Sequence, residues 1–147
     1  MKKVHVWQLG FATQRDKVLH DKSKVECRQM GYVLIDDNED DPAETVWNLL
    51  NWSCWSDNGK PDNVFSPLDH CNDDIIVNVE GTSIYACADF IGFTETTSLK
   101  DAIAHSLEHF DGWCFHDVER RSGFYKEIDG KAYWRKNKGD DWKEVTW

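Results

Sequence analysis

The alternation of hydrophobic and polar positions is strongest between residues 74 and 91. Hydrophobic residues recur at every second position on both sides of a turn around Gly81, at Ile75, Val77 and Val79 and then at Ile84, Ala86, Ala88 and Phe90. A repeat of two with β-branched residues and a glycine turn predicts a β-hairpin whose second strand ends at Gly92. The opposite face carries Ile76, Tyr85 and Ile91. We therefore expect the hairpin to be central in a sheet, with other elements packed on both faces.

Two amphipathic helices are predicted, one before and one after this hairpin. The first covers residues 42–51, where Asp41 suits the N-cap and Pro42 suits the first helical position. The second covers residues 98–110 and is expected to be capped by Thr96, Thr97 or Ser98. Its apolar positions follow the helical spacing of three and four, at Leu99, Ala102, Ile103, Ser106, Leu107 and Phe110. We expect the larger ones to be buried, namely Leu99, Ile103, Leu107 and Phe110.

The rest of the chain completes an α+β domain. The remaining elements are, in order, a strand at 4–9, one helix or two short ones at 13–29, a strand at 31–35 and an irregular loop at 52–66. Turn signals at Asp129-Gly130 and Lys138-Gly139-Asp140 divide the C-terminal part into a β-meander. We expect a single domain over residues 1–147 with a mixed or antiparallel sheet, in which residues 113–147 could form an appended β subdomain.

The composition is typical of a folded protein without a membrane span. Hydrophobic residues make up 40% of the 147 residues and include 8 Trp and 7 Phe, which suffices for one domain with its own core. No apolar run approaches the roughly 18 residues of a membrane helix, and the first residues are too polar for a signal peptide. The 5 cysteines are odd in number and scattered. We therefore expect reduced thiols in a cytosolic protein.

Negative charge is concentrated in the middle of the chain. The net charge is −10, and residues 31–81 alone carry −11, from twelve acids against Lys60. Residues 82–119 carry −6, whereas residues 1–30 carry +4 and residues 120–147 carry +3. Such a distribution repels nucleic acid and favours a partner with a basic surface, although solubility is the commonest meaning of a negative surface.

Residues 105–109 match the H-x-x-E-H pattern of inverted zincins, in which two histidines hold zinc and the glutamate acts as base. The expected helix phase directs His105, Glu108 and His109 to solvent or to the flank of the helix. A catalytic zinc also needs a third protein ligand and a shaped cleft. We therefore expect no metal and no cofactor, and interpret the segment as a polar helix face. A small metal-dependent hydrolase that uses His105 and His109 is the alternative.

Other catalytic patterns are weaker. A structural zinc site would need loops to meet, because its candidates are not spaced as C-x-x-C; they are Cys54, His70, Cys71, Cys114 and His116. The sequence contains no P-loop, no G-x-G-x-x-G and no G-x-S-x-G. We therefore expect a binding protein without catalytic residues.

Four parts of the chain resemble the YodL-like domain family. They are VHVWQL at 4–9, the strand at 32–35, ETVWNLLN at 44–51, and the ordered positions Ser66, Leu68, Asp74-Ile75-Ile76, Gly81, Tyr85 and Ile91-Gly92-Phe93. The resemblance covers residues 4–95. It implies an accessory protein of phages and conjugative elements, of a kind often found within larger polyvalent proteins thought to counter bacterial defence. It brings no established catalytic residues.

These features combine into one hypothesis, a small acidic protein that binds and inhibits a host defence protein of the anti-CRISPR or anti-restriction type in the host cytoplasm. The candidate binding residues are Asp36, Asp37, Glu39, Asp40, Asp41, Trp52, Trp55, Asp57, Asp62, Asp69, Asp73 and Asp74. If their two loops meet at one end of the sheet, the resulting patch would fit a basic groove, with affinity supplied by the aromatic residues.

We expect no direct contact with nucleic acid or membrane, and the sequence leaves the oligomeric state open. A structural or housekeeping phage protein is a further alternative. The second candidate surface is the C-terminal meander, with Arg120, Arg121, Trp134 and Trp142.

Overall fold

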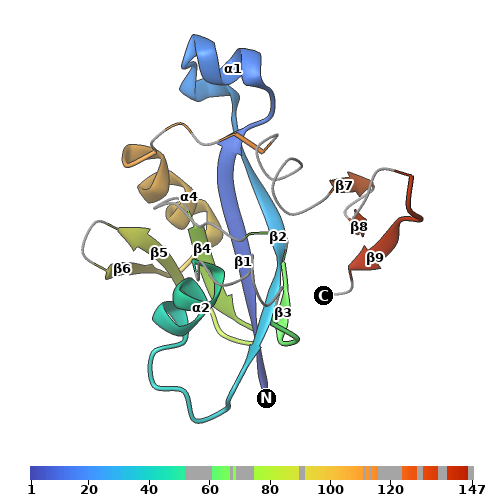
Figure 1. Cartoon of the computed structure of the whole chain (residues 1–147). Helices are drawn as coiled ribbons and strands as arrows, with labels where there is room; N and C mark the ends of the chain where they lie inside the picture. The colour runs from blue at the N-terminus through green and yellow to red at the C-terminus, as the bar shows by residue number, and fades with distance from the viewer. Residues whose placement is uncertain are drawn as a thin grey trace.

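The computed structural model describes residues 1–51, 61–66, 68, 75–89, 92–110, 112, 114–115, 124–128, 131–135 and 139–145. They form an α+β fold around a six-stranded antiparallel sheet with the strand order β3-β2-β1-β4-β5-β6 (Figure 1). Its strands are β1 (Lys2–Phe11), β2 (Val25–Ile35), β3 (Val64–Phe65), β4 (Ile75–Val79), β5 (Tyr85–Asp89) and β6 (Gly92–Thr96). The predicted fold class is confirmed.

The described helices are α1 (Gln14–Leu19), a 3₁₀ turn (Lys22–Lys24), α2 (Pro42–Leu50) and α4 (Leu99–Glu108). Helix α2 begins as predicted, because the Asp41 carboxylate accepts a hydrogen bond from the N–H of Glu44 at 3.2 Å. Helix α4 begins after Ser98, whose Oγ accepts from the N–H of Asp101 at 3.1 Å. Within the described residues, no helix has the length and apolar character needed to cross a bilayer.

The predicted central hairpin is confirmed as β4 and β5, and β4 lies between β1 and β5. The prediction is wrong at Ile84, which precedes β5 and is 47% exposed. The side-chain amide of Asn78 donates to the carbonyls of Thr82, at 3.1 Å, and Ile84, at 2.8 Å. These bonds hold residues 82–84 in the turn, so the second strand starts one residue later than its hydrophobic pattern suggests.

A sixth strand follows the hairpin where the sequence predicted an end. Gly92 begins β6, and Phe93 pairs with Ala88 of β5. The second strand of the hairpin therefore ends at Asp89, three residues before the predicted end at Gly92, and Gly92 already belongs to the next strand. Phe90 and Ile91 lie outside the described residues.

Strand β2 is twice as long as predicted. Residues 25–30, assigned from the sequence to the end of a helix, are its first half. Val25 pairs with Phe11 and Cys27 pairs with Leu9, while the intervening Glu26 is exposed. This alternation places Val25 and Cys27 against the core. Pairing with β1 therefore outweighs the helix propensity of this segment, and of the one or two helices predicted at 13–29 the structure retains α1 and the 3₁₀ turn.

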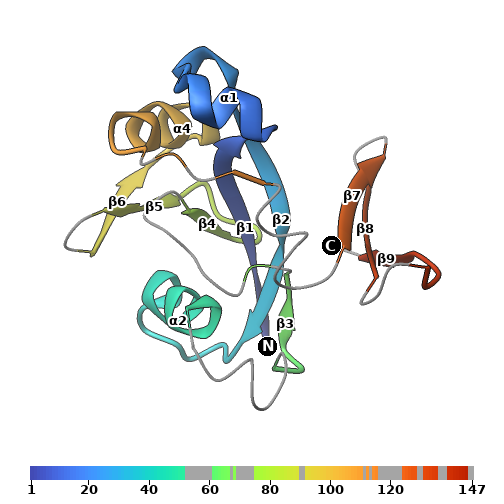
Figure 2. The same ribbon diagram turned by 45° about the horizontal axis from the view of Figure 1, so that its top comes forward.

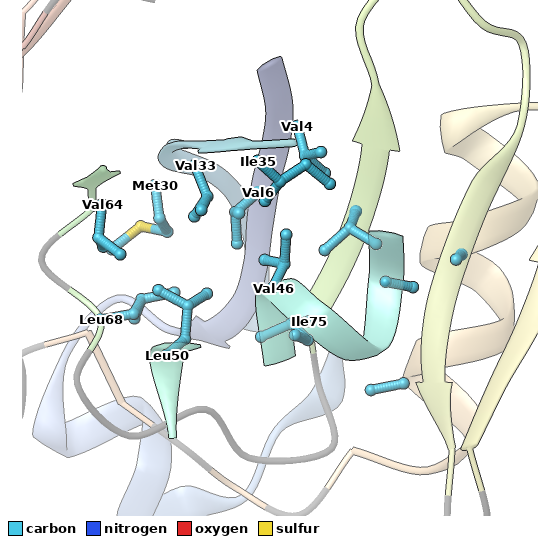
Figure 3. Close-up of a cluster of buried hydrophobic side chains, with 14 of the residues drawn as sticks. Val4, Val6, Met30, Val33, Ile35, Val46, Leu50, Val64, Leu68 and Ile75 are labelled. Carbon is cyan, nitrogen blue, oxygen red and sulfur yellow. The ribbon is translucent and has the colours of Figure 1, made fainter. Parts of the chain in front are cut away.

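The large sheet is covered on both faces, by α2 on one side and by α4 on the other (Figure 2). Strand β4 shows the division, because Ile75 and Val77 pack in the α2 cluster and Ile76 packs in the α4 cluster. The labelled residues of the α2 cluster come from four strands, a helix and a loop; they are Val4, Val6, Met30, Val33, Ile35, Val46, Leu50, Val64, Leu68 and Ile75 (Figure 3). Burial on both faces explains why both phases of β4 are apolar.

Helix α4 contacts the sheet through small residues. Ala102 and Ser106 are fully buried, whereas Leu99, Ile103 and Leu107 are half-buried at the edge of the contact; Phe110 is buried as predicted. The thiol of Cys87 donates to the carbonyl of Ala102 at 3.4 Å. The short side chains let the helix backbone approach β5 closely, which rotates the helix relative to the prediction. The expected burial of Leu99, Ile103 and Leu107 is therefore only partial.

A short strand, β3, interrupts the segment predicted as an irregular loop. Phe65 pairs with Tyr32 of β2, and the two rings stack with their centroids 4.7 Å apart. Gly31 permits this approach, since its φ is +138° and a Cβ atom there would collide with the carbonyl oxygen of Phe65. The loop prediction is wrong for residues 64–65, and residues 52–60 lie outside the described residues.

The predicted C-terminal meander is confirmed as a second, three-stranded antiparallel sheet of β7 (Phe124–Ile128), β8 (Lys131–Arg135) and β9 (Lys143–Val145). It shares no strand with the large sheet. The guanidinium of Arg135 lies 4.3 Å from the centre of the Trp142 ring. Of the predicted turn residues, Asp129, Gly130 and Lys138 lie outside the described residues, whereas Gly139 and Asp140 are described.

Candidate functional site

One end of the large sheet carries exposed carboxylates from three segments. We call this group the acidic end; it consists of Asp36, Asp37, Asp40, Asp41, Asp62 and Glu80. The β2–α2 loop follows Ile35, which pairs with Lys2 at the start of β1. The N–H of Glu80 donates to the carbonyl of Lys3 at 2.9 Å, and this bond brings the β4–β5 turn to the same place (Figure 1).

The third segment reaches the acidic end through β3. The N–H of Leu34 donates to the carbonyl of Asn63 at 2.9 Å, and the side-chain amide of Asn63 donates back to the carbonyl of Leu34 at 2.9 Å. This paired contact fixes Asp62 beside the end of β2. Asp62 is the one acid of the second loop that the structure describes, so the expected meeting of the two acidic loops stays a prediction for Asp57, Asp69, Asp73 and Asp74.

The β2–α2 loop is held in shape by hydrogen bonds of its own residues and by one from Lys2 of β1. The Asp36 carboxylate accepts from the N–H of Asn38 at 2.9 Å, and Asp41 caps α2. The ammonium of Lys2 donates to the carbonyl of Glu39 at 3.2 Å, and Glu39 is half-buried. Local side-chain bonds of this type define a turn. The loop therefore presents its charges from a preorganised backbone, which lowers the ordering cost of binding.

Nearby cations neutralise only part of this charge. The amino group of Met1 lies 3.3 Å from the carboxylate of Asp37, and the Lys3 ammonium lies 4.0 Å from Glu80. The ring Nε2 of His5 lies 2.9 Å from Glu80. In the described part of the chain, no basic group lies within ion-pair distance of Asp40, Asp41 or Asp62.

The structure places about half of the predicted binding residues. Trp52, Trp55, Asp57, Asp69, Asp73 and Asp74 lie outside the described residues. Glu80 joins the acidic end although the sequence analysis did not select it. Its position in the hairpin turn could have indicated this. The antiparallel pairing of β4 with β1 places that turn beside the first residues of β1.

The opposite end of the sheet carries charges of both signs. Arg15, Lys17, Lys22 and Lys24 of α1 and the 3₁₀ turn lie there together with Asp16, Asp21, Glu26 and Glu108. The 10 residues of β1 connect the two ends, and at about 3.3 Å per residue they separate the charges by roughly 30 Å. This distance exceeds the Debye length of about 8 Å at physiological ionic strength. The acidic end therefore acts on a partner independently of the charges at the opposite end.

A second cluster of polar groups lies between β5 and α4. The Nε2 atom of His105 is 3.5 Å from Oδ2 of Asp89, and Nε2 of His109 is 4.0 Å from Oδ1 of Asp89. The imidazole rings are 5.1 Å apart, as expected for positions one helical turn apart. All three side chains are about one quarter exposed. Two imidazoles and a carboxylate are groups that can hold a divalent metal ion.

In the H-x-x-E-H segment, the glutamate and the two histidines lie on different sides of α4. Glu108 is exposed, whereas His105 and His109 are half-buried and lie beside Asp89. The sequence analysis directed the segment to solvent or to the flank of the helix; Glu108 lies in solvent, and the two histidines lie at the flank, turned toward β5. Asp89, at the end of the central hairpin, is the neighbour that the sequence analysis did not select.

The described thiols are buried or half-buried. Cys87 and Cys114 are fully inaccessible, and Cys27 is half-buried. Burial, with a smaller contribution from the neighbouring Cys87, raises the pKa of the Cys27 thiol to about 12. Burial also raises the pKa of Cys87. The other proposed zinc ligands, Cys54, His70, Cys71 and His116, lie outside the described residues, as do Arg120 and Arg121.

Comparison with protein-family models, with curated proteins and with solved structures finds no match for this chain. The resemblance of residues 4–95 to the YodL-like family therefore stays a prediction.

Proposed function

We propose that this protein is a small acidic accessory protein of a phage or mobile element, which inhibits a bacterial defence protein by covering a basic nucleic-acid groove. The observation that carries the proposal is the acidic end, where carboxylates from three segments are exposed on a backbone fixed by its own hydrogen bonds. The phage or mobile-element origin and the role against defence rest on the resemblance to the YodL-like family. The mode of binding rests on the charge geometry.

The physical basis is competition with the nucleic-acid backbone. Double-stranded DNA presents one negative charge for about 1.7 Å of its axis, and a protein that binds it places lysine and arginine against these charges. A rigid group of carboxylates fits the same basic surface and repels DNA from it. Charge complementarity of this kind raises the association rate and selects the partner, while buried apolar contacts determine the dissociation rate.

The separation of charge along the sheet supports a defined orientation. A basic groove attracts the end that carries Asp36, Asp37 and Asp40, whereas the end that carries Arg15 and Lys24 has charges of both signs. The protein would therefore approach such a groove with its acidic end first. This orientation places the β2–α2 loop, the β4–β5 turn and residues 61–63 in the interface.

The direct test uses purified CRISPR or restriction nucleases and fluorescently labelled DNA. Adding the protein should raise the apparent dissociation constant of one of these nucleases for DNA, measured by fluorescence anisotropy. The effect should weaken as salt is raised from about 50 to about 200 mM, because screening reduces the attraction between the charged surfaces. A nuclease that binds the protein without losing affinity for DNA would contradict the proposed mode of inhibition.

Two variants that change the net charge equally separate a specific surface from charge in general. The acidic-end variant replaces Asp36, Asp37, Asp40 and Asp41 with Asn, and the control variant replaces Asp21, Glu95, Asp101 and Asp141 with their amides. Each removes four charges from the net −10 and leaves −6. Asn also caps helices and turns, so the loop bonds of Asp36 and Asp41 are retained. Inhibition should fall in the acidic-end variant alone.

A further inference from the structure

We propose that Asp89, His105 and His109 form a site for one Zn²⁺ ion, which joins strand β5 to helix α4. This inference is independent of the proposed inhibition of a defence protein. The ligands come from two elements, Asp89 from the end of β5 and the two histidines from consecutive turns of α4. Their potential ligand atoms all lie within 4.8 Å of one another.

The distances are close to those of a tetrahedral zinc site. Two donor atoms at about 2.0–2.1 Å from zinc and at the tetrahedral angle lie roughly 3.3 Å apart. The Asp89 oxygens lie 3.5 Å from Nε2 of His105 and 4.0 Å from Nε2 of His109. Side-chain rotations that shorten these distances, and the separation of the two histidine nitrogens from within 4.8 Å, would bring all three donors to bonding distance.

Two further observations support a ligand between these residues. Nε2 of His105 is inaccessible to solvent and makes no hydrogen bond among the described residues, although Oδ2 of Asp89 lies 3.5 Å away. An unsatisfied buried nitrogen is costly, and coordination to a metal ion would satisfy it. The hydroxyl of Thr94 donates to Oδ2 of Asp89 at 3.0 Å, the kind of hydrogen bond that orients a metal-binding carboxylate.

The chemical type of the three ligands indicates which metal ions they would bind. Imidazole nitrogens favour zinc and other late transition metals, whereas Mg²⁺ and Ca²⁺ prefer sites made wholly of oxygen ligands. Three protein ligands leave the fourth tetrahedral position for water or another ligand. Because the ion would join β5 to α4, we expect it to stabilise the folded chain by mass action.

The most direct experiment needs no variant. Zn²⁺ is titrated into the untagged, chelator-treated protein, while the side-chain ¹⁵N signals of its 6 histidines are followed by NMR. We expect saturation at one equivalent, shifts of the ring nitrogens of His105 and His109, and no such shifts with Mg²⁺. Absence of zinc binding, or shifts confined to other histidines, would overturn the proposal.

Three variants and a control then assign the ligands. Asp89→Asn, His105→Gln and His109→Gln should each weaken Zn²⁺ binding by about tenfold or more, measured by competition with a chelating dye. His20→Asn is the control, because His20 is exposed and has φ +53°, a conformation that Asn tolerates. Melting temperatures in chelator show whether each variant is folded. Unchanged zinc affinity in all three folded variants would place the ion elsewhere, for example on the cysteines, and refute the site.

Discussion

Asp89 and His105 lie on different elements and 16 positions apart in the sequence, yet Oδ2 of one is 3.5 Å from Nε2 of the other. The contact exists because Ala102 and Ser106 are small, which lets α4 approach β5 and turns His105 toward the strand. The same packing directs Glu108 to solvent. The small residues on the buried face of α4 therefore determine that His105, and not Glu108, lies beside Asp89.

The close approach of β3 to β2 predicts a large effect at Gly31. Gly31→Ala should lower the free energy of unfolding by about 3 kcal/mol or more, because it combines a strained φ with a collision against the Phe65 carbonyl. Gly81→Ala is the matched control, since Gly81 has φ +87° but no atom within 4 Å of the added Cβ. It should cost only about 1–2 kcal/mol. Urea unfolding of both variants measures the difference, and equal losses would refute the steric explanation.

The packing of α2 predicts a difference between two leucines. Leu50 is completely buried in the α2 cluster, whereas Leu19 of α1 is 64% exposed. Leu50→Ala should lower the free energy of unfolding by about 2–5 kcal/mol, and Leu19→Ala should change it by about 0.5 kcal/mol or less. Thermal or denaturant unfolding provides both values. A small loss for Leu50→Ala would show that α2 is not docked on the sheet.

The sequence predicted an element correctly where a single local pattern determines that element. The alternation at Ile75, Val77, Ala86 and Ala88 located the central hairpin, and Asp41 located the start of α2. It was insufficient where tertiary pairing decides. Helix formers filled residues 13–29, and only pairing with β1 makes Val25 and Cys27 part of a strand.

The candidate sites show the same limit. The acids of residues 36–41 are adjacent in sequence and could be selected directly. Glu80 and Asp89 could not be selected, because tertiary contacts place them. The hydrogen bond of Glu80 to Lys3 brings it to the acidic end, and the packing of α4 brings His105 beside Asp89. The orientation of α4 was also missed, since hydrophobic periodicity favours large residues at the centre of the buried face and the structure places Ala102 and Ser106 there.

The buried thiol of Cys27 predicts weaker stability at alkaline pH. Its pKa rises from 9.0 to about 12 in the folded chain. Above pH 9 the unfolded chain releases this proton while the folded chain retains it, so the free energy of unfolding falls as pH rises through this range. The contribution is at most about 1.4 kcal/mol per pH unit. Chemical denaturation between pH 8 and pH 11 should show a shallower decline for Cys27→Ala, and parallel curves would contradict the assignment.

The most direct measurement of the proposed function is phage plating efficiency on bacteria that carry a single defined defence system. Cells express the wild-type protein, the acidic-end variant or the control variant of equal net charge, at matched protein levels. We expect the wild type and the control variant to restore plating on at least one defended strain, and the acidic-end variant to restore it at least about tenfold less, because steering by charge contributes roughly 10- to 1000-fold to association. Restoration by all three proteins alike would show that the acidic end is not the interface, and no restoration on any CRISPR or restriction strain would contradict the proposed function.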